Sequence, residues 1–584
     1  MRDNQLCSMV PQRIIIFCGI VGIIFIAIVA RLSYLQINLS DYFLTRSQQN
    51  CLHISHTHSA RGTILDCRSK LLATNRPRTL IAWAGSGNRT LTTDQQAILA
   101  LLDTTLDAPI STNNELMLAI MRAERNKKST IISTDISAEQ LGKLSEQLPQ
   151  DCNIQIISDF QRYYPYQTSA SHLLGYLGGI NAENYGKMGL EKLLEDTLRG
   201  QKGTVLSIID SIGRNINQTI LQHALTGGDI CTTLDIELQA ICEHVFSPEL
   251  SGAFIIMNPL DGSIMSMLSR PNFDPNIFLQ PISQDEWNVL IEKKPFLNRG
   301  LNATYPMGSI FKLVTISAAF KEGIVPCDMH YTTTCKGYYK FCGRKYWCNN
   351  HYGHGQINIA QSIADSCNII FFNIGRKIDI DTLAYYASLF GLGKRTGISL
   401  PESSGLIPTR AWKKACKGES WWPGETLSAT IGQSFNSVTP LQVARMISAI
   451  FTGYLVKPRI LVDEAIEKKP LEIPLHIRKF LKRSMKRVVR CGTGSRLKRF
   501  KDIKMYAKTS TAQTSALEKR VLGGQYLEHG WFVGNFTYKD HTPLTIVILV
   551  EHAGSAQVAA SIAQKFVGEY KKLMDSRAQV VATA

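Results

Sequence analysis

"YPMGSIFKL", residues 305–313, places Ser309 one helical turn before Lys312 in an otherwise apolar run. Side chains three residues apart lie on the same face of a helix. A lysine kept away from water binds its proton less tightly, and a neutral amine can accept a proton from a neighbouring hydroxyl. A buried Lys312 would therefore activate Ser309, whereas an exposed one would only extend its amine into solvent. The S-x-x-K spacing alone occurs often by chance and leaves both interpretations open.

Two more short motifs follow Ser309 along the chain. "ADSCNIIFF" (364–372) contains Ser-Cys-Asn at 366–368 before an apolar helix, and "IKMYAKTSTAQT" (503–514) alternates like a strand and contains Lys-Thr-Ser at 508–510. S-x-x-K, then a serine-x-asparagine triplet, then K-T-G is the catalytic signature of penicillin-binding proteins and related β-lactamases. Three motifs in this order favour the nucleophile interpretation of Ser309.

The composition allows several domains and narrows the choice of partners. The chain has 584 residues, of which 44% are hydrophobic, which is enough for more than one core. The net charge of +17 comes from scattered lysines and arginines and short clusters such as "RKFLKRSMKRVVR" (478–490). We interpret that cluster as an amphipathic helix with a solvated basic face. The sequence carries no nucleic-acid-binding motif, so we expect no nucleic-acid partner and attribute the charge to anionic lipid or wall polymer.

The N-terminus carries an apolar stretch suited to a membrane. "IIIFCGIVGIIFIAIVA" (14–30) has no charged residue, and its apolar character resumes at Leu32 and continues to Leu35. Arg2 and Arg13 precede it, so the positive-inside rule predicts a cytoplasmic tail at residues 1–13. We interpret residues 14–35 as an uncleaved transmembrane signal anchor with the rest of the chain outside the cytoplasm.

Two regions follow the anchor. Residues 45–225 mix strand-like runs with polar linkers and show no acid, base and nucleophile together, which indicates an extended, mixed α+β pedestal. "TTLDIELQ" (232–239) reads as a strand running into a helix, and it opens a compact α/β region at residues 230–575. That region ends with an apolar strand (543–552) and a helix (556–574), and residues 576–584 form a tail.

The resemblance to a known family covers nearly the whole chain. The family's pedestal boxes are similar to "SARGTILD" and "GLEKLLED", and its later boxes to "FGLGKRTGISLPESSG", "ATIGQSFNSVTPLQVA" and "HGWFVGNF". The chain resembles class B penicillin-binding proteins, and "GHGQINIAQSIADSCN" and "WKKACKGESWWPGETL" resemble their elongation-type group, penicillin-binding protein 2. The resemblance implies an α/β (α+β) transpeptidase domain, an antiparallel sheet flanked by helices, that follows the pedestal.

The resemblance assigns a role to each residue of the motifs. Ser309 would attack the penultimate D-Ala of a peptidoglycan stem peptide, release the terminal D-Ala and remain as an acyl-enzyme. Lys312 would be the general base, and Ser366 would relay a proton to the leaving amine. Asn368 would orient Lys312 and the substrate amide, and Lys508 would face the substrate carboxylate. An amine of a second stem peptide would complete the cross-link, and β-lactams would acylate the same serine.

The third motif is expected to bind substrate. The resemblance implies that Thr509, Ser510 and Thr511 line the substrate strand, with the Thr511 hydroxyl on the substrate carboxylate. The backbone N–H groups of Ser309 and Thr511 would form the oxyanion hole.

Three departures from the family pattern leave alternatives open. Ser510 and Ser434 stand where the family usually has glycine, and Met307 where it often has proline. A side chain at position 510 adds bulk beside the strand that must accept the substrate backbone. An acyl-serine D,D-carboxypeptidase or β-lactam hydrolase on the same fold is one alternative, and a non-catalytic scaffold for a glycan polymerase is another.

The resemblance also implies partners and a location. The expected partner is the membrane-embedded rod-shape glycan polymerase of the elongation complex. The expected location is the bacterial cytoplasmic (inner) membrane, by a single-pass anchor with the catalytic domain periplasmic or otherwise extracytoplasmic.

Four of the fourteen cysteines and two histidines fall between residues 335 and 368. Disulfides are natural outside the cytoplasm, while three thiolates and one imidazole also form an accepted structural zinc site. The spacing favours four ligands, and the resemblance supports the same set: Cys335, Cys348, His354 and Cys367. Cys367 lies between two residues that face the substrate, so a metal ion on its thiolate would hold that turn in register. We favour zinc over disulfides and expect no organic cofactor.

Overall fold

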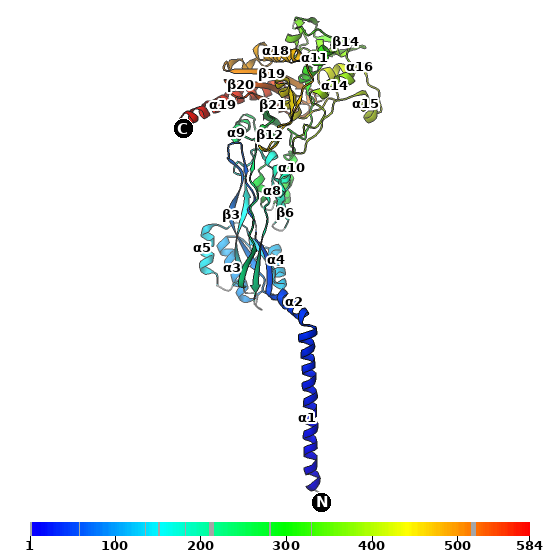
Figure 1. Ribbon diagram of the computed structural model, residues 1–584. Coiled ribbons are helices and arrows are strands. Elements are labelled where there is room, and N and C mark those ends of the chain that lie inside the picture. The colour runs from blue at the N-terminus through cyan, green and yellow to red at the C-terminus, as the bar shows by residue number, and fades with distance from the viewer. Residues whose placement is uncertain are drawn as a thin grey trace. The chain divides into compact units, whose positions relative to one another are not determined.

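The computed structural model describes residues 3–57, 59–134, 136–149, 152–180, 183–209, 215–279, 282–328, 330–514 and 521–583. Residues 1 and 2 of the expected cytoplasmic tail and Ala584 of the expected C-terminal tail lie outside this set. The chain forms two compact units that alternate along the sequence (Figure 1). The first unit comprises Met1–Ala60, Pro77–Phe160 and Gly200–Thr226. The second comprises Arg61–Arg76, Gln161–Arg199 and Gly227–Ala584.

The chain begins with a long helix, α1 (Asp3–Ser33), which continues through a π-helical turn (Tyr34–Asn38) into α2 (Ser40–Cys51). The segment Ile14–Asn38 is apolar enough and long enough to cross a membrane. Its apolar side chains are exposed, as a lipid-facing helix requires.

The first unit contains two groups of strands and three amphipathic helices. Its three-stranded sheet has the order β1-β8-β9 (Leu52–Thr57, Gly203–Ile209, Asn215–Gln222). The last part of β3 (Leu71–Ala84) pairs with β4 (Ser129–Ser133), and β5 (Ile154–Tyr163) also pairs with β3. The helices α3 (Thr93–Leu106), α4 (Asn114–Asn126) and α5 (Ala138–Gln147) bury Leu99, Ile120 and Leu144 around Trp83.

The N-terminal segments of the second unit are built around one buried carboxylate. Glu191 is fully buried in α7 (Gly189–Leu193) and accepts hydrogen bonds from Arg61 Nε at 2.6 Å and Arg162 Nε at 2.7 Å. The Tyr164 hydroxyl donates to the same carboxylate at 3.1 Å. Glu191 therefore joins the two pedestal boxes found in the sequence, which lie about 130 residues apart. The short elements nearby are β2 (Ile64–Leu65), α6 (Ser171–Leu174), β6 (Leu177–Ile180), β7 (Glu183–Gly186), α8 (Glu195–Leu198) and β10 (Ile230–Cys231).

A five-stranded antiparallel sheet forms the centre of the second unit. Its order is β12-β11-β21-β20-β19 (Ile264–Arg270, Gly252–Met257, Leu544–Val550, His529–Tyr538, Ile503–Ala512). Every residue of β11 and β21 is buried, because helices cover both faces of the sheet. The helices α9 (Ile236–Val245) and α19 (Ala556–Thr583) cover one face, with Phe254 and Phe566 in edge-to-face contact at 5.1 Å.

The helices next to the first two motifs, together with the helices that pack against them, lie on the other face. They include α11 (Lys312–Lys321), α12 (Ile359–Ala364), α13 (Ile369–Gly375), α14 (Ile380–Leu389), α16 (Pro423–Thr430) and α17 (Pro440–Thr452). Helix α18 (Leu475–Cys491) buries one apolar stripe and exposes Lys479, Arg483, Lys486 and Arg490, in line with the amphipathic pattern. Its other basic residues depart from that pattern, because Arg478, Lys482 and Arg487 are half-buried. The remaining elements are α10 (Gln284–Glu292), β13 (Thr332–Cys335), β14 (Tyr338–Phe341), β15 (Arg344–Trp347), β16 (Gly355–Asn358), α15 (Arg410–Lys417), β17 (Tyr454–Val456) and β18 (Lys468–Pro470).

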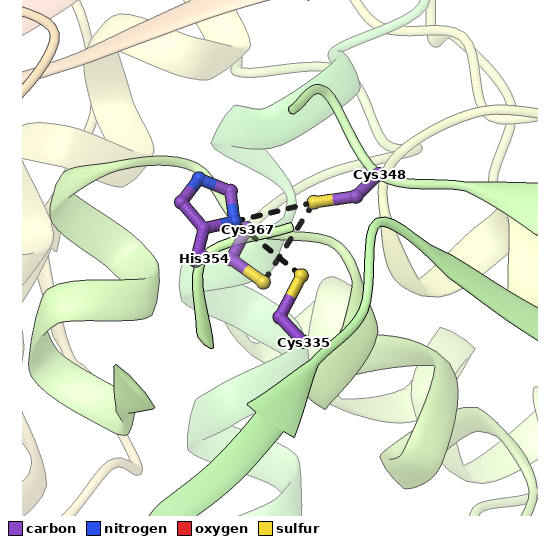
Figure 2. A group of neighbouring side chains, drawn as sticks. All are labelled: Cys335, Cys348, His354 and Cys367. Carbon is purple, nitrogen blue, oxygen red and sulfur yellow. Dashed lines mark hydrogen bonds between the residues drawn. The ribbon is translucent and has the colours of Figure 1, made fainter. Parts of the chain in front are cut away.

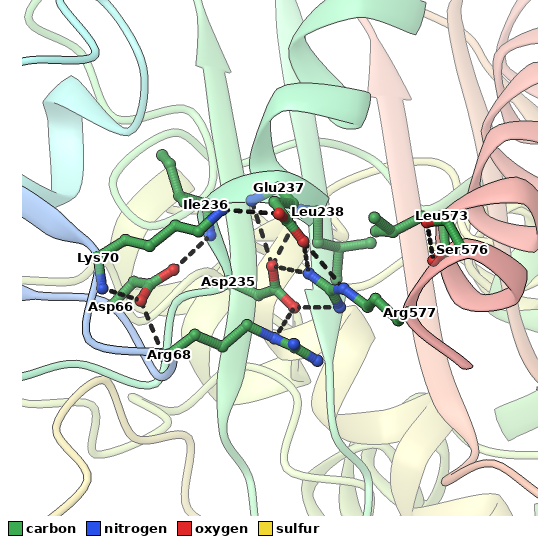
Figure 3. Close-up of polar contacts among 10 residues, drawn as sticks. All are labelled: Asp66, Arg68, Lys70, Asp235, Ile236, Glu237, Leu238, Leu573, Ser576 and Arg577. Atoms are coloured by element: carbon green, nitrogen blue, oxygen red, sulfur yellow. Dashed lines mark hydrogen bonds and ion pairs between the residues drawn. The ribbon is translucent and has the colours of Figure 1, made fainter. Parts of the chain in front are cut away.

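Helix α19 extends to Thr583, well beyond the end at residue 574 that the apolar pattern predicts. Polar contacts explain the extension (Figure 3). Arg577 donates two hydrogen bonds of 2.7 Å to Asp235, the residue that caps the N-terminus of α9, and also pairs with Glu237. These contacts lower the pKa of Glu237 to about 2, mainly through its hydrogen bonds from Lys70 and Arg577. The apolar pattern cannot reveal an ion pair between residues 342 positions apart.

Replacing Glu191 with alanine should destabilise the second unit strongly. The change leaves the Arg61 and Arg162 guanidinium groups buried without their shared carboxylate, which costs about 3–5 kcal/mol in comparable proteins. Denaturant unfolding of the purified chain, followed by tryptophan fluorescence, measures the loss. Lys143→Ala removes an exposed, solvent-screened ion pair with Glu139 and should leave the free energy of unfolding almost unchanged. Equal losses for the two variants would contradict this account.

Candidate functional site

Ser309 lies in a tight turn immediately before α11. The turn is one 3-10 element, Gly308–Ile310, and the α-helix begins at Lys312, so the expected one-turn separation holds although the two residues do not share a single α-helix. Gly308 has φ +54°, and its N–H donates to the Gly432 carbonyl at 2.9 Å. The Trp531 indole N–H donates to the Pro306 carbonyl at 3.1 Å. The turn is therefore fixed by contacts from two distant parts of the chain.

The Lys312 amine is fully buried and surrounded by oxygen atoms of residues 366–368. Its Nζ lies 2.7 Å from the Ser366 carbonyl, 3.2 Å from the Cys367 carbonyl and 2.7 Å from Asn368 Oδ1. The Phe371 ring lies 5.2 Å away. Burial lowers the pKa of Lys312 to about 8, so about a tenth of the amine is neutral at pH 7, far more than for an ordinary lysine.

Ser366 connects the other motif residues. Its hydroxyl donates to Ser309 Oγ at 2.7 Å, and both Lys312 Nζ (3.3 Å) and Lys508 Nζ (3.2 Å) reach its Oγ. Ser366 has φ +60°, a strained left-handed conformation for a serine, which aims its side chain at this meeting point. Within the described residues, the hydrogen bonds link Lys312 to Ser309 through Ser366.

The third motif lies on β19. Lys508 is fully buried, and burial, reinforced by the charge of Lys312, lowers its pKa well below the ordinary lysine value. Thr509 Oγ1 is hydrogen-bonded to Thr493 Oγ1. Thr511 is exposed on the strand, and its Oγ1 accepts a hydrogen bond of 3.2 Å from the N–H of Ala556 at the start of α19.

The Ser510 side chain points into the protein. Its hydroxyl is buried and donates to the Met307 carbonyl at 2.8 Å, so it ties β19 to the Ser309 turn. Ser434 is exposed and has φ +69°, a conformation that glycine adopts at no steric cost and that explains why glycine is usual there. Met307 is fully buried in the main core.

Cys335, Cys348, His354 and Cys367 converge on one point (Figure 2). Their ligand atoms all lie within 4.8 Å of one another, and the three cysteines are buried. Cys335 ends β13, Cys348 follows β15, and Cys367 is the middle residue of the Ser-Cys-Asn turn. Cys342 and His351, the two residues that the spacing leaves over, are exposed and are not part of this group.

The spacing of the four side chains suits a tetrahedral metal ion. His354 Nδ1 lies 3.4 Å from Cys335 Sγ and 3.6 Å from Cys348 Sγ, and the Cys348 and Cys367 sulfurs are 3.8 Å apart. Tetrahedral zinc holds ligand sulfurs about 3.8 Å apart and a sulfur and a nitrogen about 3.6 Å apart, as follows from its bond lengths. A disulfide needs about 2.0 Å between sulfurs, and all three thiols are free here. The hydrogen bond between the Cys348 and Cys367 sulfur atoms lowers the pKa of Cys348 to about 4.

The sequence motifs did not reveal three contacts of this site. Asn368 Nδ2 donates to the Trp347 carbonyl at 3.0 Å, which joins the Ser-Cys-Asn turn to β15. Thr493 contacts the third motif, and Gly432 contacts the Ser309 turn. Only the hairpin has a local signal, the mixture of aromatic and basic residues in "YYKFCGRKYW" (338–347). The other two contacts depend on the tertiary fold.

Two family profiles match the chain. "Penicillin binding protein transpeptidase domain" matches residues 252–568, which include all three motifs. "Penicillin-binding Protein dimerisation domain" matches residues 56–232.

Curated relatives and solved structures agree with these profiles. "Peptidoglycan D,D-transpeptidase MrdA" of Acinetobacter baumannii is 28% identical over 93% of this chain and 85% of its own length. The penicillin-binding protein PBP2 of Helicobacter pylori, solved in complex with MreC, has a TM-score of 0.78 and 24% identity, with 89% of this chain and 99% of that chain covered. A chain from a peptidoglycan synthase complex has a TM-score of 0.72 and 27% identity, with 96% and 98% covered.

The predicted fold class is confirmed by these neighbours and by the antiparallel sheet with its flanking helices. The relatives belong to the elongation-type group that the sequence resembles. The transpeptidase profile matches more than half of this chain, so the chain belongs to the penicillin-binding protein transpeptidase family.

Proposed function

We propose that this chain is a peptidoglycan D,D-transpeptidase of cell elongation that works through an acyl-enzyme on Ser309. One observation carries the assignment: Ser309, Ser366 and two buried lysine amines form one continuous hydrogen-bonded group. Relatives named peptidoglycan D,D-transpeptidase match nearly the whole chain, in agreement with this function.

The geometry defines a path for the proton in the first step. In the resting arrangement Ser366 donates to Ser309, so for attack the two hydroxyl hydrogens must first rotate until Ser309 donates to Ser366 and Ser366 donates to the neutral amine of Lys312. As Ser309 Oγ then attacks the carbonyl carbon of the penultimate D-Ala, its proton moves to Ser366 Oγ, whose own proton moves to that amine. Collapse of the tetrahedral intermediate breaks the peptide bond, and the proton returns through Ser366 to the leaving amine of D-Ala. Lys312 is neutral again when the acyl-enzyme has formed.

The second step repeats this path with a new amine. The acceptor amine attacks the acyl carbon, gives its proton to the Ser366–Lys312 pair and displaces Ser309 Oγ, which regains a proton. Lys508 has no carboxylate partner among the described ion pairs, so an arriving substrate carboxylate would favour its charged form. Attack by water instead of an amine would make the chain a D,D-carboxypeptidase, so the fate of the acyl group separates the two activities.

The Lys-Thr-Ser motif agrees with an active enzyme. The Ser510 hydroxyl is turned toward Met307 and is satisfied there, while Lys508 retains its contact with Ser366. A scaffold without catalysis would not need two buried lysines that have no carboxylate partner among the described residues, because such lysines are costly to keep. We therefore favour an active transpeptidase over a non-catalytic scaffold.

We further propose that Cys335, Cys348, His354 and Cys367 bind one structural zinc ion. The donor set and spacing support this, and a bound zinc ion supplies a rigid cross-link between these side chains. Cys367 lies between Ser366 and Asn368, so fixing its sulfur holds the turn that surrounds the Lys312 amine.

The anchor and the partners follow from the same assignment. We propose that residues 14–35 cross the bacterial inner membrane once and that the rest of the chain lies outside the cytoplasm. The rod-shape glycan polymerase of the elongation complex is the proposed partner, since similar chains have been solved with MreC and in a peptidoglycan synthase complex.

Ser309 should be the residue that fluorescent penicillin labels. Ser309→Ala should abolish the covalent adduct, and Lys312→Ala should slow acylation by about 100-fold or more while the fold is retained, because the proton acceptor is lost. Mass spectrometry of the labelled chain locates the adduct. Cys416→Ser changes an exposed, remote side chain and should label normally. An adduct on another residue would contradict the assignment.

The acyl group should pass to an amine in preference to water. The purified chain, supplied with donor stem pentapeptides and an acceptor that carries a free amine, should give cross-linked dimers as its main product. Mass analysis of the products distinguishes dimers from trimmed tetrapeptides. Exclusive trimming would identify a carboxypeptidase, and neither product from a chain that still binds penicillin would refute the transpeptidase proposal.

Metal analysis tests the zinc proposal. The purified chain should contain about one zinc ion, and a chelator should remove it, expose thiols to titration and lower the thermal midpoint. Cys367→Ser should reduce zinc content, whereas Cys342→Ser, which changes an exposed cysteine outside the group, should not. Absence of metal together with a Cys348–Cys367 disulfide would be the opposite outcome.

A further inference from the structure

The β14–β15 hairpin has two different faces. One face packs against the core through Tyr339 and Tyr346, whose rings lie 6.0 Å and 5.7 Å from that of Phe372. The opposite face carries two cross-strand pairs, Tyr338–Trp347 and Lys340–Lys345. Trp347 is 42% exposed, and both lysines are exposed. Side chains alternate along a strand, so these four form one continuous surface, which we call the outer face.

The outer face breaks a local rule of sheet stability. Lys340 and Lys345 lie directly opposite each other, and like charges in that arrangement are destabilising. Neither lysine has a carboxylate within ion-pair distance among the residues that the structure describes, and their amines contact aromatic rings instead. Lys345 Nζ lies 5.2 Å from the Tyr338 ring and 5.8 Å from that of Trp347. A strained, uncompensated feature of this kind is more typical of a binding surface than of a structural one.

The hairpin is joined directly to the catalytic residues. The Trp347 carbonyl accepts a hydrogen bond from Asn368 Nδ2, and Asn368 Oδ1 contacts Lys312 Nζ. The same chain of contacts continues through Ser366 to Lys508. The outer face and Lys508 thus lie at opposite ends of one hydrogen-bonded chain, with Ser366 and its bond to Ser309 near the middle.

We propose that the outer face of the β14–β15 hairpin binds the acceptor stem peptide, an acidic peptide with free carboxylates near its nucleophilic amine. This inference rests on the proposed function, because only a transpeptidase needs a second peptide. The donor carboxylate is assigned to Lys508, at one end of the chain of contacts. A pair of unpaired lysines at the other end offers charge complementarity to a second anionic peptide, and Trp347 and Tyr338 offer apolar area beside it.

Direct binding to the full chain with Ser309→Ala tests this surface without turnover. The probe is a fluorescein-labelled stem tetrapeptide with a free amine and free carboxylates, and its matched control is the same peptide with the carboxylates converted to amides. Fluorescence anisotropy gives both dissociation constants. We expect the double variant Lys340→Glu and Lys345→Glu to weaken binding of the free acid about tenfold and to leave the weaker binding of the amide unchanged.

A second double variant controls for net charge. Lys479→Glu and Lys486→Glu make the same change on the exposed face of α18 and should leave both constants within about twofold of the parent. Equal weakening by the two double variants, or equal affinity for the free and amidated peptides, would overturn the proposal. If the thermal midpoint shows that the hairpin variant does not fold, the salt dependence of binding to the Ser309→Ala parent provides the test. Binding of the free-acid peptide that does not weaken with added salt would also overturn the proposal.

The outcome is separable from that of the function itself. Selective loss of free-acid binding supports a carboxylate-dependent peptide site on the hairpin, and cross-linking by the parent enzyme is needed to make that site the acceptor site; a parent that forms no cross-links would refute the acceptor role. Cross-linking by the parent, together with unaltered peptide binding by the hairpin variant, would retain the transpeptidase and reject this surface.

Discussion

The burial of the Lys312 amine is the constraint on which the catalytic region depends. An amine removed from water must be surrounded by hydrogen-bond acceptors or lose its proton, and here the carbonyls of Ser366 and Cys367 and the Asn368 side chain surround it. These contacts permit an ammonium ion, while burial pulls the pKa down to about 8. The balance leaves the amine able to accept a proton at neutral pH and to return it within one turnover.

That arrangement requires an unusual turn at residues 366–368. Ser366 adopts a left-handed backbone conformation, which is strained for a serine. In this conformation the Ser366 side chain points toward Ser309, and the next side chain, Cys367, points toward Cys348. The turn is held on one side by the cysteine–histidine group and on another by the Trp347 carbonyl. The β14–β15 hairpin is attached to the same cysteine–histidine group, because Cys335 precedes the hairpin and Cys348 directly follows it.

Local patterns could be predicted from the sequence, whereas long-range contacts could not. The apolar N-terminal stretch, the alternation around Lys508 and the basic stripe of α18 each depend on neighbouring residues, so a local pattern reveals them. Spacing and the family resemblance together indicate the four cysteine and histidine side chains that the fold brings within 4.8 Å of one another. The Glu191 cluster, the bond between Arg577 and Asp235 and the proton path through Ser366 join residues that only the fold brings together.

The serine in the third motif shows why a departure from a family pattern needs the structure for its interpretation. A side chain on β19 could project toward the substrate or toward the Ser309 turn, and the sequence cannot tell which. Ser510 takes the second direction, and a Cβ on Gly308 would lie only 2.4 Å from Ser510 Oγ. The absence of a side chain at Gly308 therefore makes room for the one at Ser510. Since the buried hydroxyl is satisfied by the Met307 carbonyl, the substitution costs little and adds a direct bond between the strand of the third motif and the turn that carries the nucleophile.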